Sequence, residues 1–180
     1  MTNPRLTAKH IAHVSGLVSR YIVAQHDEFL EGCAPLSPEQ RAAMNGFFSP
    51  HLLDDVRVSN LYGVRVANPT CYQLLAGMGF ANLPDFSQMA AITFSDVVVS
   101  HVPFTNGLLF HELIHVEQYR QLGVPQFSNL YVLGFLIGDG HEGIPLESNA
   151  YVLGARFEAR PRQRFSVADE VSEWARSRRF

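Results

Sequence analysis

The sequence predicts an α+β fold that is mainly helical, with a small mixed sheet beside a helix that carries two histidines. Apolar residues recur at helical spacing over most of the chain. One stretch, residues 91–102, is instead rich in β-branched residues, which favour strands. The 180 residues, 47% of them hydrophobic, suit one domain over residues 1–180 with one sizeable core.

The first half of the chain alternates helical and extended patterns. Residues 7–29 have apolar positions at steps of three and four, which predicts an amphipathic helix. Ser37 is a suitable N-cap for a short helix over residues 38–44, which begins with proline. Residues 56–66 alternate locally and predict one or two strands. Residues 71–78 fit a short helix or a strand equally well.

The second half begins with the predicted strand at residues 91–102. Gly123 is a helix stop signal, and a glycine-rich turn is expected at residues 138–143. These signals separate three predicted helices, over residues 106–122, 128–137 and 145–159. Pro161 ends the last of them, and a final short helix is expected around Trp174.

Composition excludes several classes of function. The formal net charge of −3 provides no field that would attract nucleic acid or an anionic membrane, and the arginine-rich C-terminal end fits a solvated helix face. The longest apolar run, residues 130–138, is too short to span a bilayer. No secretory signal is evident in residues 1–13, so we expect a cytoplasmic location. Cys33 and Cys71 are expected as free thiols, with one disulfide as the alternative.

The chemistry of the chain is concentrated in the segment His-Glu-Leu-Ile-His. His111 and His115 are four residues apart in a predicted helix, so both rings project from one face and can reach one metal ion. Glu112 would face the open coordination position and take a proton from a water that zinc activates. The segment therefore predicts a zinc-dependent hydrolase with Glu112 as general base, acting on a peptide or protein substrate.

A third zinc ligand is expected downstream, because a catalytic zinc ion usually has three protein ligands and one open position. Glu147 is the preferred ligand, since it opens the predicted helix 145–159 and would be held by a second rigid element. His141, Glu142 and Asp139 in the glycine-rich turn are the alternatives.

Two segments carry a resemblance to a known group of proteins. Residues 111–119 read His-Glu-Leu-Ile-His-Val-Glu-Gln-Tyr, and residues 144–151 read Ile-Pro-Leu-Glu-Ser-Asn-Ala-Tyr. Together they resemble the zincin-type metallopeptidases of the gluzincin group. They are also similar to a small bacterial zincin-like domain family. The similarity covers roughly residues 92–151.

This resemblance implies a zincin-like fold in which His111, His115 and Glu147 bind zinc and Glu112 is the general base. It also implies that an extended peptide lies along the strand at residues 92–100, using its unpaired backbone groups.

The chain departs from the gluzincin pattern at one position. Some gluzincins have an aspartate four residues after the glutamate ligand, where it orients a zinc-bound histidine, and this chain has Tyr151 there. The ligands must then be oriented by another side chain. Asn149, Asp139 and Asp96 are the candidates.

A peptidase also needs a hydrogen-bond donor for the developing oxyanion. His141 is the preferred donor, because its glycine-flanked loop could bring it over the zinc ion, and Tyr151 and Tyr119 are the other candidates. His101, at the end of the predicted strand, could line the cleft or simply be exposed.

Two non-enzymatic interpretations remain open. In the first, zinc only staples the helices, and a fourth protein ligand such as His141 closes the coordination shell. In the second, the chain is an interaction domain on a zincin scaffold. The presence of Glu112 favours the enzyme, because a scaffold has no chemical need for a carboxylate at that position.

Overall fold

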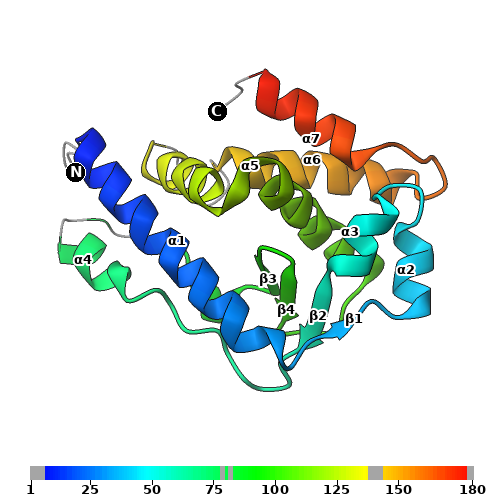
Figure 1. The fold of residues 1–180 in the computed structure, drawn as a ribbon, viewed down its shortest axis with the longest axis horizontal. Coiled ribbons are helices and arrows are strands. Elements are labelled where there is room, and N and C mark those ends of the chain that lie inside the picture. The colour runs from blue at the N-terminus through cyan, green and yellow to red at the C-terminus, as the bar shows by residue number, and fades with distance from the viewer. Residues whose placement is uncertain (1–6, 78–79, 81–82, 138–143, 178–180) are drawn as a thin grey trace.

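The structure, a computed structural model, describes residues 7–77, 80, 83–137 and 144–177. These residues form mostly helices, with a small mixed sheet packed among them (Figure 1). The α-helices are α1 (Ala8–Leu30), α2 (Pro38–Met44), α3 (Pro50–Asp55), α4 (Cys71–Gly77), α5 (Asn106–Ile137), α6 (Pro145–Ala159) and α7 (Val167–Arg176). The mainly helical α+β prediction is thus confirmed, whereas the single domain stays a prediction.

Capping residues set several helix boundaries, and one of these caps, Ser37, was predicted from the sequence. Thr7 caps α1 and Ser37 caps α2, each with a side-chain oxygen that accepts from the third helical N–H. Ser49 caps α3 in the same way, followed by a proline. Helix α3 was not predicted, although the serine-proline signal that begins α2 occurs there too. Residues 71–78, which fitted a helix or a strand, contain the helix α4.

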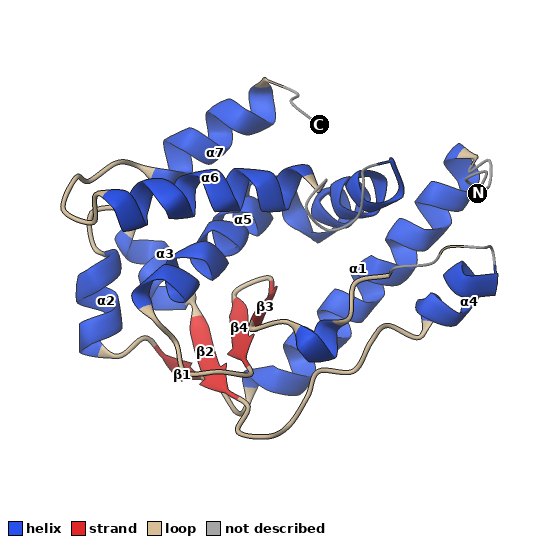
Figure 2. Cartoon of the chain, turned by 180° about the vertical axis from the view of Figure 1, so that it is seen from behind, coloured by secondary structure: helices blue, strands red, loops and turns tan. Residues whose placement is uncertain are grey.

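The sheet contains four short strands, β1 (Ala34–Pro35), β2 (Arg57–Asn60), β3 (Ala91–Phe94) and β4 (Val97–Ser100). Their order is β1-β2-β4-β3, and only β2 and β4 are parallel (Figure 2). The single strand predicted over residues 91–102 is wrong: Ser95, at φ 62°, turns the chain back as a hairpin. The predicted strand region 56–66 contains β2 alone.

A kink at Gly123 divides helix α5. This glycine has φ 72° and ψ 159°, a backbone conformation outside the helical region that glycine adopts at little cost. The predicted stop is therefore correct, but the chain resumes the helix at once rather than at residue 128. Beyond the kink, Val132 and Leu136 of α5 pack in one hydrophobic cluster with Val14 of α1.

Helix α5 is the centre of the packing. It contacts α1, α6, α7 and β3, and Leu109, Leu113 and Ile114 on it are fully buried. At Gly134 the second part of α5 passes so close to the start of α6 that an added Cβ would lie 2.5 Å from Cδ of Pro145. This close approach fixes the first turn of α6 against α5.

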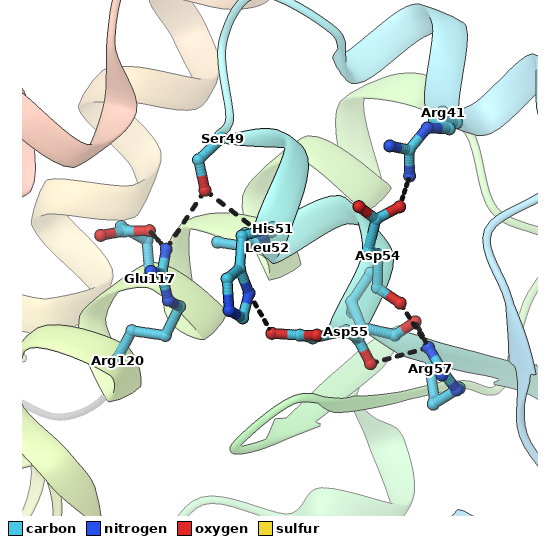
Figure 3. A network of polar contacts seen from close by, with 10 residues as sticks. Arg41, Ser49, His51, Leu52, Asp54, Asp55, Arg57, Glu117 and Arg120 are labelled. Atoms are coloured by element: carbon cyan, nitrogen blue, oxygen red, sulfur yellow. Dashed lines mark hydrogen bonds and ion pairs between the residues drawn. The ribbon is translucent and has the colours of Figure 1, made fainter.

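A polar network covers another side of α5, towards α3 (Figure 3). The buried carboxylate of Glu117 accepts from Arg120 Nη1 at 2.9 Å and from Gln121 Nε2 at 2.8 Å. The same Arg120 nitrogen lies 3.4 Å from Ser49 Oγ at the start of α3. Arg41 of α2 pairs with Asp54 of α3. Side chains of this chain thus satisfy the charge of Glu117.

Two expectations of the sequence concern membranes and thiols. Within the described residues, no helix combines the length and apolar content that crossing a bilayer requires. Cys33 and Cys71 are both free thiols, and burial raises the pKa of each.

Candidate metal centre

Helix α5 brings His111 and His115 together on one face. Because they are one turn apart, their rings meet, and the two Nε2 atoms lie 3.1 Å from each other. The His115 side chain is 7% exposed and that of His111 is 16% exposed, so neither ring lies open to solvent. The two rings therefore lie on one face of α5, and that they bind a metal ion stays a prediction.

Glu147 reaches the same point from α6. Pro145 occupies the first turn of α6, where its missing N–H costs nothing, and Glu147 follows in that turn. Its Oε2 atom lies 3.4 Å from Nε2 of His111 and 3.4 Å from Nε2 of His115. These residues form a group that could hold a metal ion.

The spacing and chemistry of these three atoms fit a bound divalent cation. Zinc binds histidine nitrogen and carboxylate oxygen at about 2.0–2.1 Å, and a tetrahedron with such bonds separates its ligand atoms by about 3.3–3.4 Å. The observed separations of 3.1, 3.4 and 3.4 Å are close to this value. Two imidazoles and a carboxylate in a buried position would otherwise cost free energy through loss of hydration.

The electrostatics of the cluster also favour positive charge. Burial of the His115 ring is the largest single influence and disfavours its charged form, but the contributions of Glu147, Glu112 and Gln118 together outweigh it and raise the pKa of His115 to about 9. Glu147 makes the largest of these favourable contributions, and the hydrogen bond that His115 donates to Gln118 makes the smallest.

Gln118 orients His115 and was not identified from the sequence. Its Nε2 donates to the Leu146 carbonyl and to Asn149 Oδ1, both at 3.0 Å, so its Oε1 must face His115. His115 Nδ1 donates to that oxygen at 2.8 Å, which leaves Nε2, beside Glu147, as the nitrogen that could bind a metal ion after losing its proton. The glutamine therefore holds one ligand and links α5 to the first turns of α6.

The three residues predicted to orient the metal ligands lie in different places. Asn149 supports the site, but indirectly, through its hydrogen bond with Gln118. Asp96 lies instead beside His26, 3.0 Å from its Nε2. Asp139 lies outside the described residues, as do the alternative ligands His141 and Glu142.

Glu112 is held by the sheet. Its side chain is buried, and its Oε2 accepts a hydrogen bond of 2.7 Å from Thr93 Oγ1 on β3. The same hydroxyl lies 3.3 Å from the Glu112 carbonyl oxygen. Thr93 was not identified from the sequence either. The available signal was a polar residue among apolar neighbours in a strand whose residues are all buried.

One cavity of ≈560 Å³ joins these groups. His111, Glu112, His115 and Glu147 all line it, together with Thr93. The cavity therefore brings the metal-ligand cluster and the predicted general base into contact with one space of a size that binds small molecules or peptide side chains.

Two tyrosines predicted as donors also line this cavity. The Tyr151 ring lies 4.8 Å from the ring of His111 and is 55% exposed. Tyr119 is buried and stacks on Phe127 at 3.7 Å. Burial, with help from Glu147 and Glu112, holds the pKa of Tyr119 well above its ordinary value, so its hydroxyl keeps its proton.

Two histidines were also considered for this region, His141 as an oxyanion donor and His101 as a residue that could line the cleft. His141, the preferred donor, lies outside the described residues. His101 is a structural tie rather than a cleft residue: its Nδ1 donates to the Met89 carbonyl at 2.7 Å, and its Nε2 accepts from the Val66 N–H at 3.1 Å.

Comparison of the chain with protein-family models, with curated proteins and with solved structures found no significant match. The resemblance to gluzincins therefore remains a prediction.

Proposed function

We propose that this protein is a zinc-dependent peptidase of the zincin class. The observation that carries the proposal is the convergence of His111, His115 and Glu147 in the cavity that Glu112 also lines. The resemblance of the two sequence segments to gluzincins supports it independently. So does the position of the histidine-bearing helix α5 beside the edge strand of a small mixed sheet.

His111, His115 and Glu147 would hold the metal. Two imidazoles and one carboxylate form a common ligand set of catalytic zinc, and borderline ligands of this kind favour zinc over calcium or magnesium. When bound, zinc lowers the pKa of a coordinated water towards 7 and polarises a substrate carbonyl.

Glu112 is the proposed general base. Thr93 fixes its Oε2, and no hydrogen bond of its Oε1 occurs among the described residues, so Oε1 can accept a proton from the attacking water. Glu112 would then pass that proton to the amine that leaves when the peptide bond breaks. Because Thr93 is part of β3, the sheet itself sets the position of the base.

Strand β3 offers a place for the peptide backbone. It pairs only with β4 among the described strands and is therefore the edge of the sheet. Its residues Ala91 to Phe94 line the cavity, so a peptide added along this edge would lie beside the metal-ligand cluster. Tyr119 and Tyr151 remain the candidate oxyanion donors among the described residues.

The decisive experiment replaces Glu112 with glutamine. Wild-type protein, Glu112→Gln and the control Glu117→Gln are supplied with zinc and given a mixture of unmodified peptides, and cleavage is followed by mass spectrometry. Glu117 is a matched control because it is a buried glutamate on the same helix whose carboxylate joins the Arg120 network. Zinc content is measured on every sample.

We expect Glu112→Gln to keep zinc and to lose peptide hydrolysis by a factor of about 10² to 10⁴, while Glu117→Gln keeps both. Undiminished hydrolysis by Glu112→Gln would contradict the role of this base. Stoichiometric zinc in a wild-type protein that cleaves no peptide would identify a non-catalytic zinc module instead.

A further inference from the structure

The cavity continues well beyond the metal ligands. Away from His111 and His115, its wall is formed by α1, by the segment that begins with the short 3₁₀-helix η1 (Phe86–Gln88), and by β3. We call this part the apolar chamber. It is lined by Val18, Tyr21, Ile22, Phe86, Met89 and Phe94.

Aromatic packing builds the wall of the apolar chamber. Tyr21 stacks on Phe86 at 5.7 Å and meets Phe94 edge to face at 5.9 Å. The Tyr21 hydroxyl donates a hydrogen bond to the Ala67 carbonyl at 2.7 Å. The ring therefore presents carbon to the chamber while its polar atom is already engaged.

The charges that line the cavity are confined to other parts of it. The described acidic and histidine residues that line the cavity are His111, Glu112, His115, Glu147 and Glu158. Glu158 belongs to α6 and lies beside Gly107, at the start of α5. No lysine, arginine or aspartate is among those lining residues. A charged substrate group in the apolar chamber would lose hydration without gaining a partner, whereas an apolar group would gain free energy by leaving water.

The available space suits a large group. The whole cavity of ≈560 Å³ lies within the range of about 300–1,000 Å³ that is usual for ligand sites. A smaller cavity of ≈30 Å³ shares Val18, Phe86 and Tyr131 with it, so these side chains lie at the boundary between the two cavities.

We propose that the apolar chamber binds a large apolar side chain of the substrate, aromatic or long aliphatic, close to the peptide bond that is hydrolysed. The statement about the bond rests on the proposed function. The binding preference does not, because it follows from the chamber walls alone.

Binding is tested in a protein that cannot turn over its ligand. Glu112→Gln protein is titrated with fluorescent peptides that differ only at one central residue, which is phenylalanine, leucine, methionine, lysine, aspartate or glycine, and anisotropy gives each Kd. The same titrations are repeated after adding Val18→Trp or Met89→Trp, which fill the chamber from two different elements. Val23→Trp is the control, because Val23 is on α1 but is 49% exposed and does not line the cavity.

We expect the phenylalanine, leucine and methionine peptides to bind at least about tenfold more tightly than the others, which is the effect of burying one such side chain. Val18→Trp and Met89→Trp should remove this preference, and Val23→Trp should retain it. Equal binding of all six peptides would overturn the proposal. So would a preference for charged residues, or one that both chamber-filling variants leave unchanged in folded protein.

Hydrolysis of the same peptides by zinc-loaded wild-type protein separates this proposal from the proposed function. An apolar binding preference without cleavage would support the chamber and contradict the peptidase. Cleavage without any apolar preference would support the peptidase and contradict the chamber.

Discussion

Glu117 and Glu147 are both buried carboxylates, yet the groups that face them differ. Glu117 is 4% exposed and lies against the guanidinium of Arg120 and the amide of Gln121. Glu147 is 8% exposed and faces the Nε2 atoms of two imidazoles, each 3.4 Å away. The chain itself supplies the cation beside Glu117. Around Glu147 it supplies two histidine nitrogens, and the three residues together could hold a metal ion.

The largest expected effect comes from removing the charge of Glu147. Glu147→Gln should weaken zinc binding by about a thousandfold or more, since an anionic ligand is lost from a buried site, whereas Glu117→Gln should leave it unchanged. Competition titration with a zinc-sensitive chelator measures both affinities. Equal zinc affinities in the two variants would remove the distinction between the two carboxylates.

The next largest expected effect is that of Glu117→Gln on the stability of the protein. Glu117→Gln should lower the free energy of unfolding by about 1–3 kcal/mol, because the partnership with Arg120 and Gln121 is broken in a buried position. Urea denaturation of the metal-free protein measures it. If Glu147→Gln destabilises the metal-free protein by as much, the two glutamates have the same structural role.

The contact of α5 with α6 tests whether the backbone positions Glu147. In Gly134→Ala the new Cβ would lie 2.5 Å from Cδ of Pro145 and 3.0 Å from Cα of Ile144, so we expect destabilisation of about 1–3 kcal/mol and weaker zinc binding. Gly154→Ala is the control on α6, where an added Cβ meets nothing within 4 Å. Thermal unfolding and zinc titration should show no loss there, and a loss equal to that of Gly134→Ala would exclude the steric explanation.

Orientation of a ligand should matter less than the ligand itself. Gln118→Leu removes the acceptor that holds His115 Nδ1, and we expect zinc affinity to fall about 10- to 100-fold with the fold intact. Gln121→Leu, which removes a hydrogen bond to Glu117 from the same helix, is the control. An unchanged zinc affinity in Gln118→Leu would show that His115 needs no such support.

The smallest expected effect concerns the reactivity of two thiols, that of the partly buried Cys33 and that of the buried Cys71. Burial raises the pKa of Cys33 and Cys71, so less thiolate is present at a given pH than in an unfolded chain. At pH 8 both thiols should react with iodoacetamide more slowly in the native protein than in urea, where both should react fully. Native reaction as fast as the denatured reaction would contradict this burial.

The parts of the candidate site that are close together in sequence were the most predictable. His111 and His115 share a helix, so their spacing predicts their meeting directly. Pro145 indicates where α6 begins, so the position of Glu147 in its first turn was predictable. No residue close in sequence sets the distance between α5 and α6. The helix boundaries at Ser37 and Gly123 were also predicted from single residues.

The long-range contacts that complete the candidate site could not be predicted from the sequence. Thr93 is 19 residues from Glu112, and Gln118 is 31 residues from Asn149, so their pairing depends on how the sheet and α6 pack against α5. The hairpin of β3 and β4 was missed for a local reason. Ser95 adopts φ 62° without being glycine, and the strong β-propensity on both sides of it obscured the turn.

Elemental analysis of the full chain, purified without chelators, tests the central claim most directly. It should be done on wild-type protein and on the Glu147→Gln and Glu117→Gln variants in parallel. The geometry of His111, His115 and Glu147 predicts one zinc ion per chain in the wild type and in Glu117→Gln, and a clear loss in Glu147→Gln. A folded wild-type protein without stoichiometric metal, or zinc retained in all three proteins alike, would contradict a metal centre at these residues.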